Sequence, residues 1–269
     1  MDLASIIGLV LAAGMVLFSM IIGGNGIAIF LHFPSLALVL GGSFAAIMIA
    51  NSLKRVMLIP KYIGIIFHKE DYPISKTISQ IVTFSDKARR DGLLSLEDEL
   101  DNIEDPYFRD GLELVVDGTD PEIIKRILLH ELNCLQERHE VGVKLFATWG
   151  TLAPAFGMIG TLAGLISMLA HLQDTAGIGR GMSLALITTL YGTMLANMII
   201  IPFRTKLQDK DREETLLKEI IIEGILSIQC GDNPMIVEAK LLTFVSPATR
   251  DKVISEVKAE LDYRLIEST

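Results

Sequence analysis

The chain has 269 residues, of which 50% are hydrophobic and 21% are charged, and its formal net charge at pH 7 is −9. With a mean hydropathy of +0.45, this composition predicts a membrane protein. The acidic balance, without any run rich in Lys or Arg, argues against nucleic acid as a partner.

The basic residues divide the chain into apolar and polar stretches. Residues 1–50 contain no Lys or Arg, and residues 145–203 contain only Arg180, although the whole chain has 24 basic residues. A membrane-spanning helix needs about 20 apolar residues. We therefore expect four transmembrane helices, at roughly 3–22, 29–50, 146–170 and 182–203.

The polar stretches are expected to be helical and cytoplasmic. The connection after the second span begins with Lys54 and Arg55, so the positive-inside rule places the polar regions and both termini in the cytoplasm. Apolar residues recur there every three or four positions, with breaks at Gly92, Pro106 and the turn DGTDP at 117–121.

The predicted fold is an all-α membrane protein with four transmembrane helices, a helical cytoplasmic domain between helices 2 and 3, and a helical C-terminal tail. The expected boundaries are 1–53 for transmembrane helices 1 and 2, 54–144 for the cytoplasmic domain, 145–203 for transmembrane helices 3 and 4, and 204–269 for the tail.

The third span contains residues that an ordinary core helix would avoid. Its stretch LAPAFGMIGTLAGL, residues 152–165, includes Pro154, Gly157, Gly160, Thr161 and Gly164. Proline and glycine are tolerated in membrane helices, where neighbouring helices approach closely. We expect the three glycines to form a helix-packing face, while Pro154 has the alternative interpretation of a simple kink.

No Asp, Glu, Lys or Arg lies within the four predicted spans. Ion carriers normally retain an ionisable residue inside the membrane, so an ion-conducting role requires a carboxylate from another subunit. The neutral oxygens of Thr161, Thr188 and Thr189 could line the ion pathway beside it. The alternative for Thr188 and Thr189 is a hydrogen bond to a carbonyl of their own helix.

Several motifs resemble one family over almost the whole chain. LAPAFGMIGTLAGL and LALITTLYGTMLANMIIIP resemble the third and fourth membrane helices of the MotA/PomA family, the A subunits of the flagellar motor stator. MDLASIIGLV, GGSFAAIMI, KARRDGLLSLEDEL, GLELVVDGTD and EGILSIQCGDNP resemble it elsewhere. The distantly related ExbB and TolQ proteins have three spans, so an ExbB/TolQ-type energiser of envelope processes is the alternative.

The resemblance implies a motility protein of the bacterial cytoplasmic (inner) membrane, not an enzyme. It implies a homo-oligomeric ring of five A subunits around a MotB/PomB-type B subunit dimer, whose membrane helix supplies an aspartate. The proton or sodium motive force would drive torque on the rotor protein FliG, with no cofactor beyond the transported H⁺ or Na⁺. By the family pattern, Thr161 and Thr189 lie near that aspartate with Thr188 adjacent, and Pro154 and Pro202 couple ion flow to torque.

The family pattern also assigns a rotor interface to Arg89, Arg90, Glu97 and Asp98. These charges also have a purely structural interpretation, because Ser95 followed by Glu97 and Asp98 resembles the capping box of a helix start. For Pro202 the alternative interpretation is a helix stop at the membrane surface.

The transported ion stays undecided. Thr161 favours Na⁺, whereas His32 and Arg180, near the expected outer surface, would not attract cations. His130 and Cys134 are four residues apart, but two ligands at helical spacing are a weak signal for a metal, and we expect ordinary roles for them.

Overall fold

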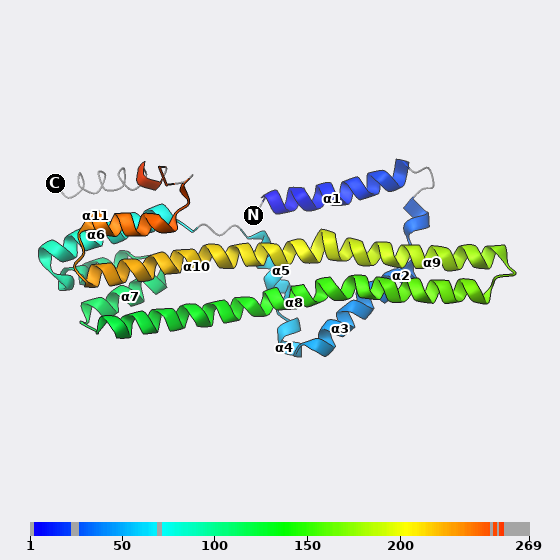
Figure 1. Cartoon of the computed structure of the whole chain (residues 1–269), viewed down its shortest axis with the longest axis horizontal. Helices are drawn as coiled ribbons and strands as arrows, with labels where there is room; N and C mark the ends of the chain where they lie inside the picture. Colours follow the sequence, from blue (N-terminus) through cyan, green and yellow to red (C-terminus); the bar gives the residue numbers. More distant parts are fainter. Residues whose placement is uncertain (1–2, 23–26, 69–71, 248–249, 252, 256–269) are drawn as a thin grey trace. The chain divides into compact units, whose positions relative to one another are not determined.

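The computed structural model describes residues 3–22, 27–68, 72–247, 250–251 and 253–255 (Figure 1). Every regular element in these ranges is a helix, which confirms the all-α prediction. The α-helices are α1 Leu3–Ile22, α2 Phe33–Leu36, α3 Gly42–Ala50, α4 Leu53–Val56, α5 Ile59–Phe67, α6 Ile74–Asp91, α7 Pro106–Val116, α8 Pro121–Ala170, α9 Thr175–Met194, α10 Ile201–Gln229 and α11 Pro234–Leu241. The 3-10 helices are η1 Ile27–Phe30, η3 Leu93–Asn102 and η5 Leu242–Phe244, and the π-helices are η2 Ala37–Gly41 and η4 Leu195–Ile200.

Four helices are long and apolar enough to cross a membrane, as predicted. They are Leu3–Ile22, Phe33–Ala50, and parts of the continuous helices Pro121–Ala170 and Thr175–Gln229. The last begins before the expected position 182, because Asp174 caps it by accepting a hydrogen bond from the amide of Ala176 at 3.0 Å.

Contacts within the chain define two compact units. The apolar unit comprises Met1–Glu70 and Arg138–Asp209, and the polar unit comprises Asp71–Glu137 and Lys210–Thr269. Helices α8 and α10 contribute to both. Where the membrane boundary cuts these two helices stays a prediction.

The apolar unit has a small core and a large apolar exterior. Its core gathers aromatic rings around Phe146, which lies 6.4 Å from Trp149 and 6.2 Å from Phe203 between ring centroids. The indole of Trp149 donates a hydrogen bond to the buried hydroxyl of Ser43 at 3.2 Å, which ties α8 to α3. By contrast, α1 has no buried residue although it is apolar throughout. Such a helix is suited to lipid rather than to water.

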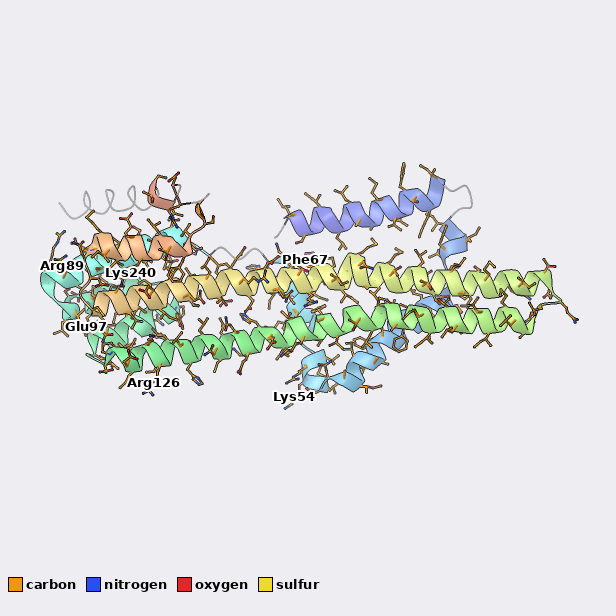
Figure 2. All side chains as sticks on the ribbon, in the orientation of Figure 1. Lys54, Phe67, Arg89, Glu97, Arg126 and Lys240 are labelled. Atoms are coloured by element: carbon orange, nitrogen blue, oxygen red, sulfur yellow. The ribbon has the colours of Figure 1, made fainter. Side chains whose placement is uncertain are left out.

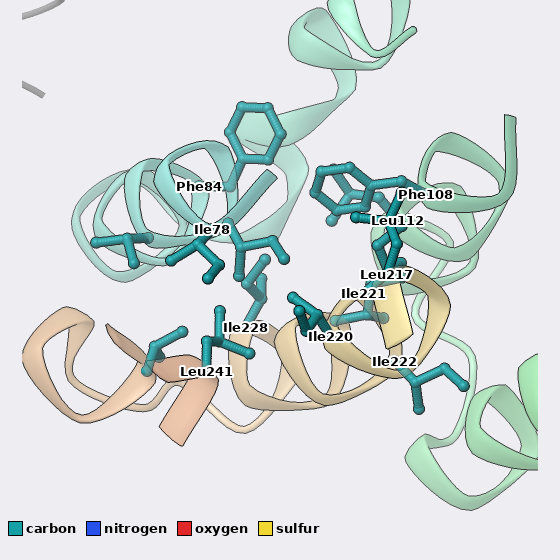
Figure 3. Packing of buried hydrophobic residues seen from close by; sticks show 14 of the residues in the cluster. Ile78, Phe84, Phe108, Leu112, Leu217, Ile220, Ile221, Ile222, Ile228 and Leu241 are labelled. Atoms are coloured by element: carbon teal, nitrogen blue, oxygen red, sulfur yellow. The ribbon is translucent and has the colours of Figure 1, made fainter. Parts of the chain in front are cut away.

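The polar unit is built on a conventional hydrophobic core. Figure 3 shows side chains of α6, α7, α10 and α11 converging, among them Ile78, Phe84, Phe108, Ile221 and Leu241. Each is at most 2% exposed, and burying a side chain of this size stabilises a fold by about 1.5–3 kcal/mol. The amphipathic spacing read from the sequence therefore corresponds to one shared core.

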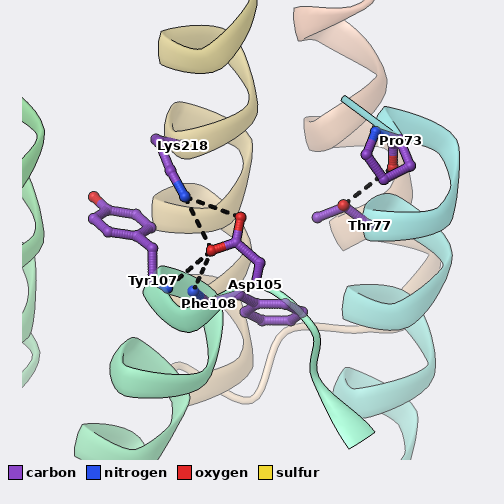
Figure 4. Close-up of polar contacts among 6 residues, drawn as sticks. All are labelled: Pro73, Thr77, Asp105, Tyr107, Phe108 and Lys218. Carbon is purple, nitrogen blue, oxygen red and sulfur yellow. Dashed lines mark hydrogen bonds and ion pairs between the residues drawn. The ribbon is translucent and has the colours of Figure 1, made fainter. Parts of the chain in front are cut away.

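An ion pair fixes the start of α7 against α10 (Figure 4). Asp105 caps α7 by accepting from the amides of Tyr107 and Phe108 at 2.8 and 3.4 Å. Both of its carboxylate oxygens also accept from the ammonium of Lys218 at 2.9 Å. The ring of Tyr107 lies under that ammonium, and burial, reinforced by the charges of Glu131 and Asp105, raises the pKa of the Tyr107 hydroxyl.

A second cluster joins α11 to the end of α10. Lys240 donates to Asp232 at 2.8 Å and to the hydroxyl of Ser227 at 3.2 Å, and it lies 3.5 Å from Glu223. The hydrogen bond from Lys240 lowers the pKa of Asp232, and the same hydrogen bond raises the pKa of Lys240. The two groups therefore stabilise each other's charged form.

The capping box suggested for Ser95 is wrong. Gly92, with a φ of 89°, ends α6 and turns the chain into the 3-10 helix η3, which begins at Leu93. Ser95 lies inside this helix, and its hydroxyl donates to the carbonyl of Gly92 at 2.7 Å instead of capping. Because a glycine adopts this conformation readily, the helix start moves upstream of Ser95.

Candidate functional site

The candidate site lies where α8 and α9 cross within the apolar unit. Small residues occupy α8 at 153, 157, 160 and 164 and α9 at 181, 185, 188 and 192, so both helices repeat them with spacings of four, three and four. This spacing places each set on one helix face. The glycines predicted to pack therefore lie against an equivalent row on α9.

The crossing is close enough that side chains would not fit at these glycines. A Cβ atom added to Gly164 would lie 2.6 Å from the carbonyl oxygen of Gly181 and from the amide nitrogen of Ala185. A Cβ added to Gly192 would lie 2.8 Å from the carbonyl oxygen of Ala153 and 3.2 Å from the Cα of Pro154. The two backbones thus touch directly, as small residues permit in membrane helices.

Thr161 and Thr189 form a hydroxyl pair across this crossing. Their Oγ1 atoms are hydrogen-bonded to each other. Each hydroxyl also faces backbone carbonyls, with Thr161 3.1 Å from Gly157 and Thr189 3.1 Å from Ala185. A hydroxyl has one proton and two lone pairs, so the two oxygens together retain acceptor capacity. Both residues are half-buried, which leaves the pair accessible from one side.

Thr188 does not join this pair. It is completely buried, and its hydroxyl donates to carbonyls of its own helix, at 2.8 Å from Leu184 and 3.0 Å from Ala185. A Cβ added to Gly160 would lie 2.5 Å from the Thr188 side chain. Thr188 therefore occupies the space that Gly160 leaves open, and its surroundings are those of a packing residue.

The two prolines lie on different helices, α8 and α10. Pro154 is inside α8 at the crossing, and because proline has no amide proton, the carbonyl of Gly150 loses its usual helical donor. Pro202 is exposed and follows the π-helix η4, in which the amide of Ile201 donates to the carbonyl of Ala196. The interpretation of Pro202 as a helix stop is wrong, because α10 continues to Gln229.

Tyr191 is a positioning contact that the sequence analysis did not assign. Its hydroxyl donates to the carbonyl of Phe30 and accepts from the amide of His32 at 3.1 Å. His32 in turn caps α2, since its Nδ1 accepts from the amide of Ser35 at 3.3 Å. A signal was present in the sequence, because Tyr191 and His32 are the two ionisable side chains within the four predicted spans.

The predicted rotor residues share an exposed surface of the polar unit, at the end of α6 and on η3 (Figure 2). All four, Arg89, Arg90, Glu97 and Asp98, are exposed, and Arg90 forms an ion pair with Asp86 one turn earlier. Lys87 holds η3 against α6 by an ion pair with Glu99 at 2.6 Å. This pair fixes the acidic side chains relative to the basic ones.

Cys134 and His130 of α8 lie side by side. The Sγ of Cys134 is 3.8 Å from Nε2 of His130. Among the described residues, no group of three or more His, Cys, Asp or Glu side chains is arranged to hold a metal ion.

Comparison with known proteins identifies the family. Residues 99–220 match the MotA/TolQ/ExbB proton channel family. The chain is 48% identical to Motility protein A of Borreliella burgdorferi, over 97% of this chain and 100% of that protein. It is 36% identical to the chemotaxis protein PomA of Vibrio alginolyticus, over 95% of this chain and 100% of that protein.

A solved structure agrees over the same length. The flagellar MotAB stator complex from Bacillus subtilis contains a chain of similar fold, with a TM-score of 0.86 and 31% identity, covering 93% of this chain and 99% of that chain. The chain matches motility proteins over nearly their full length, which favours the stator assignment over the three-span ExbB/TolQ alternative. The chain belongs to the MotA/PomA family of flagellar motor stator A subunits.

Proposed function

We propose that this stator A subunit, which with a B subunit converts an ion gradient into torque, passes its ion beside the hydroxyls of Thr161 and Thr189. The observation that carries the proposal is the hydrogen-bonded pair of threonine hydroxyls at an otherwise apolar helix crossing. A hydroxyl pair with spare lone pairs stabilises a cation or a protonated carrier in a low-dielectric environment, where a bare charge is costly.

The acid that takes up the ion comes from the partner. The four spans contain no Asp, Glu, Lys or Arg, and a buried ion needs a compensating charge. We assign this charge to an aspartate in the membrane helix of a MotB/PomB-type dimer, enclosed by a ring of five A subunits with their termini in the cytoplasm. The A subunit reconstituted alone in liposomes should therefore leak neither H⁺ nor Na⁺.

The prolines give the ion-bearing crossing its mechanical freedom. Pro154 removes one backbone hydrogen bond of α8 at the α9 contact, and Pro202 is the second residue after the π-helix η4. Helices bend at proline and at π-type turns. A change of charge beside the hydroxyl pair would thus be converted into a change of helix geometry at these two positions.

The force is delivered to the rotor protein FliG by the exposed charges of α6 and η3. Exposed ion pairs are typically worth about 0–1 kcal/mol each, so a contact made by Arg89, Arg90, Glu97 and Asp98 is weak and forms and breaks rapidly. A contact that steps from one rotor subunit to the next has to be reversible in this way.

The ion pathway is tested by the rotation speed of tethered cells while external Na⁺ and pH are varied separately. Thr161→Val and Thr189→Val remove a hydroxyl at nearly constant volume, and each should lower the speed at saturating ion concentration. Thr188→Val is the matched control on the same helix as Thr189, because the Thr188 hydroxyl donates to carbonyls of its own helix. Equal speeds for all three variants and the parent would contradict the assignment of the pathway.

The rotor surface is tested by charge reversal. Arg90→Glu and Glu97→Lys should each reduce swimming while membrane insertion and expression stay normal. Arg109→Glu reverses an exposed charge on α7 instead of on α6 or η3, and should leave swimming unchanged. If Arg90→Glu and Glu97→Lys both swim like the parent, the rotor assignment fails while the ion pathway is unaffected.

A further inference from the structure

Helix α5 lies across the two long helices of the apolar unit. The ring centroid of Tyr62 is 6.4 Å from that of Phe146 on α8, and the ring centroid of Phe67 is 5.7 Å from that of Phe203 on α10. Figure 1 likewise shows α5 running across these helices instead of along them. A helix that crosses two membrane-spanning helices in this way follows the membrane surface.

The same two contacts give the depth at which α5 lies. Phe146 comes two residues after Lys144, and Phe203 directly precedes Arg204. Between these two cations the only Asp, Glu, Lys or Arg residues are at 174 and 180. The two rings therefore lie where the apolar stretches of α8 and α10 end, which is the level of the phospholipid headgroups.

The exposed face of α4 and α5 is both basic and apolar. Lys54, Arg55 and Lys61 are exposed, and Figure 2 shows Lys54 pointing away from α8. Leu53 is 57% exposed and Met57 is 68% exposed. Such a combination is typical of segments in the headgroup region, where apolar side chains reach the acyl chains and cations reach the phosphates. Together these five residues form the α4–α5 surface.

The cations of the α4–α5 surface have no acid to neutralise them. No Asp or Glu occurs between residues 3 and 69. Within the described ranges, the side chains of Lys54 and Lys61 take part in no ion pair and no hydrogen bond, and Arg55 lies near the uncharged hydroxyl of Tyr62. Because these positive charges are not compensated from within, the surface is suited to anions from outside the unit.

A second copy of this chain has little negative charge to offer from its own apolar unit. The acids described in that unit are Glu140, Asp174 and Asp209. Glu140 pairs with Lys144 at 2.8 Å, Asp174 pairs with Arg180 at 3.3 Å, and Asp209 also has an interaction partner. Anionic phospholipids, by contrast, present uncompensated phosphates at the level of α5.

We propose that the α4–α5 surface binds the phosphates of anionic phospholipids, with Leu53 and Met57 among the acyl chains. Because α5 is packed against Phe146 and Phe203, this contact fixes the depth at which α8 and α10 leave the membrane. The surface shares no residue with the threonine hydroxyl pair or with the exposed charges of α6 and η3.

The first experiment measures which lipid lies beside the surface. The photoreactive amino acid p-benzoylphenylalanine replaces Met57 in the complex with its B subunit, in nanodiscs that contain equal amounts of phosphatidylglycerol and phosphatidylcholine. After illumination, mass spectrometry compares the two lipid adducts. Phosphatidylglycerol should be enriched about fivefold, which corresponds to about 1 kcal/mol for one cation near an anionic surface.

Met15 is the reference position for this measurement. It is also 68% exposed, but it lies on α1, and residues 1–50 contain no Lys or Arg. The same replacement there should capture the two lipids equally. If Met57 and Met15 give the same ratio of adducts, the proposal is refuted.

Two matched double variants test the cations. Lys54→Gln/Arg55→Gln removes two adjacent charges from α4 and should lower the enrichment at Met57 to about twofold or less. Lys125→Gln/Arg126→Gln removes the same two residue types, also adjacent and exposed, from the polar unit and should leave the enrichment unchanged. Full enrichment in both double variants would show that the cations do not hold the headgroups.

The second experiment identifies the occupant in the native membrane. With p-benzoylphenylalanine at Met57, illumination of cells should give an adduct with the mass of one phospholipid. An adduct with a second copy or with the B subunit in its place would overturn the proposal. Neither experiment measures ion flux or torque, so this proposal and the proposed function fail independently.

Discussion

Replacing Gly164 by alanine should weaken the crossing of α8 and α9 more than any comparable change at an open glycine. The added Cβ would lie 2.6 Å from backbone atoms of Gly181 and Ala185, whereas ordinary contact begins at 3.4 Å. The shortfall is 3.4 − 2.6 = 0.8 Å. Because the obstructing atoms are backbone, no side-chain rotation relieves it, and the helices have to separate.

Overpacking of this kind costs about 1–3 kcal/mol. Alanine also favours the helix over glycine by about 0.8–1.0 kcal/mol in aqueous hosts, so the comparison should be made with another glycine-to-alanine change. Gly14→Ala is the matched control on α1, since its Cβ meets no atom within 4 Å. Gly157→Ala is intermediate, with a shortfall of 3.4 − 3.1 = 0.3 Å to the carbonyl oxygen of Thr188.

The assay is the fraction of intact A–B complex that remains after heating in detergent, measured by size-exclusion chromatography. The expected order of stability is Gly14→Ala highest, then Gly157→Ala, then Gly164→Ala. Swimming in soft agar should follow the same order, because the crossing carries the proposed ion pathway. If Gly164→Ala were as stable as Gly14→Ala, α8 and α9 would not approach as closely as described, and the argument that glycines are required at their crossing would be wrong.

Three further predictions concern the polar contacts. Lys218→Met breaks the ion pair at the start of α7 and should lower the stability to unfolding by about 1–3 kcal/mol, because the ammonium is only 13% exposed and its carboxylate loses a charged hydrogen bond. Lys76→Met, in a pair whose acid is 83% exposed, should change little in the same urea titration. The pKa of Asp232 is lower in the folded protein than its unfolded value of 3.8, so its carboxylate stabilises the fold above that pH, and this contribution is lost as pH falls through the folded pKa. Lys240→Met removes the hydrogen bond that lowers this pKa, so the free energy of unfolding should depend less on pH between about pH 5 and 2. Tyr191→Phe leaves a carbonyl and an amide without their hydroxyl partner and should lower the thermal stability of the complex, with a loss of about 1–3 kcal/mol, whereas equal melting curves would show that these groups find other partners.

Hydropathy and charge were enough to predict the four spans and the helical polar regions. Twenty apolar residues without Lys or Arg have few alternatives in the bilayer, and Leu3–Ile22 has the predicted limits. The core of the polar unit follows from apolar spacing in the same way, since residues such as Ile78 and Phe84 recur on one helix face.

Local turn chemistry was harder to predict. Ser95 has the sequence context of a helix cap, yet Gly92 ends α6 three residues earlier and starts a 3-10 helix. The sequence pattern alone does not distinguish a cap from the interior of a short 3-10 helix, because both place a serine hydroxyl near a free backbone group.

The difference among the three threonines could not be read from α9 by itself. Thr188 and Thr189 are adjacent and chemically identical, and their roles diverge because the facing helix presents Gly160 to one and Thr161 to the other. The sequence lists the residues of each helix, but the rotation of one helix against the other decides which of them meet.

The π-helix η4 holds one residue more than an α-helix would need for the same turn. Its hydrogen bonds join residues five apart instead of four, so deleting a single amino acid between positions 195 and 200 should restore regular α geometry and keep Pro202 and the later residues on the same side. A deletion within α10 itself would turn every later residue by about 100°. Relatives that lose one residue in η4 are therefore expected to need no compensating indel nearby.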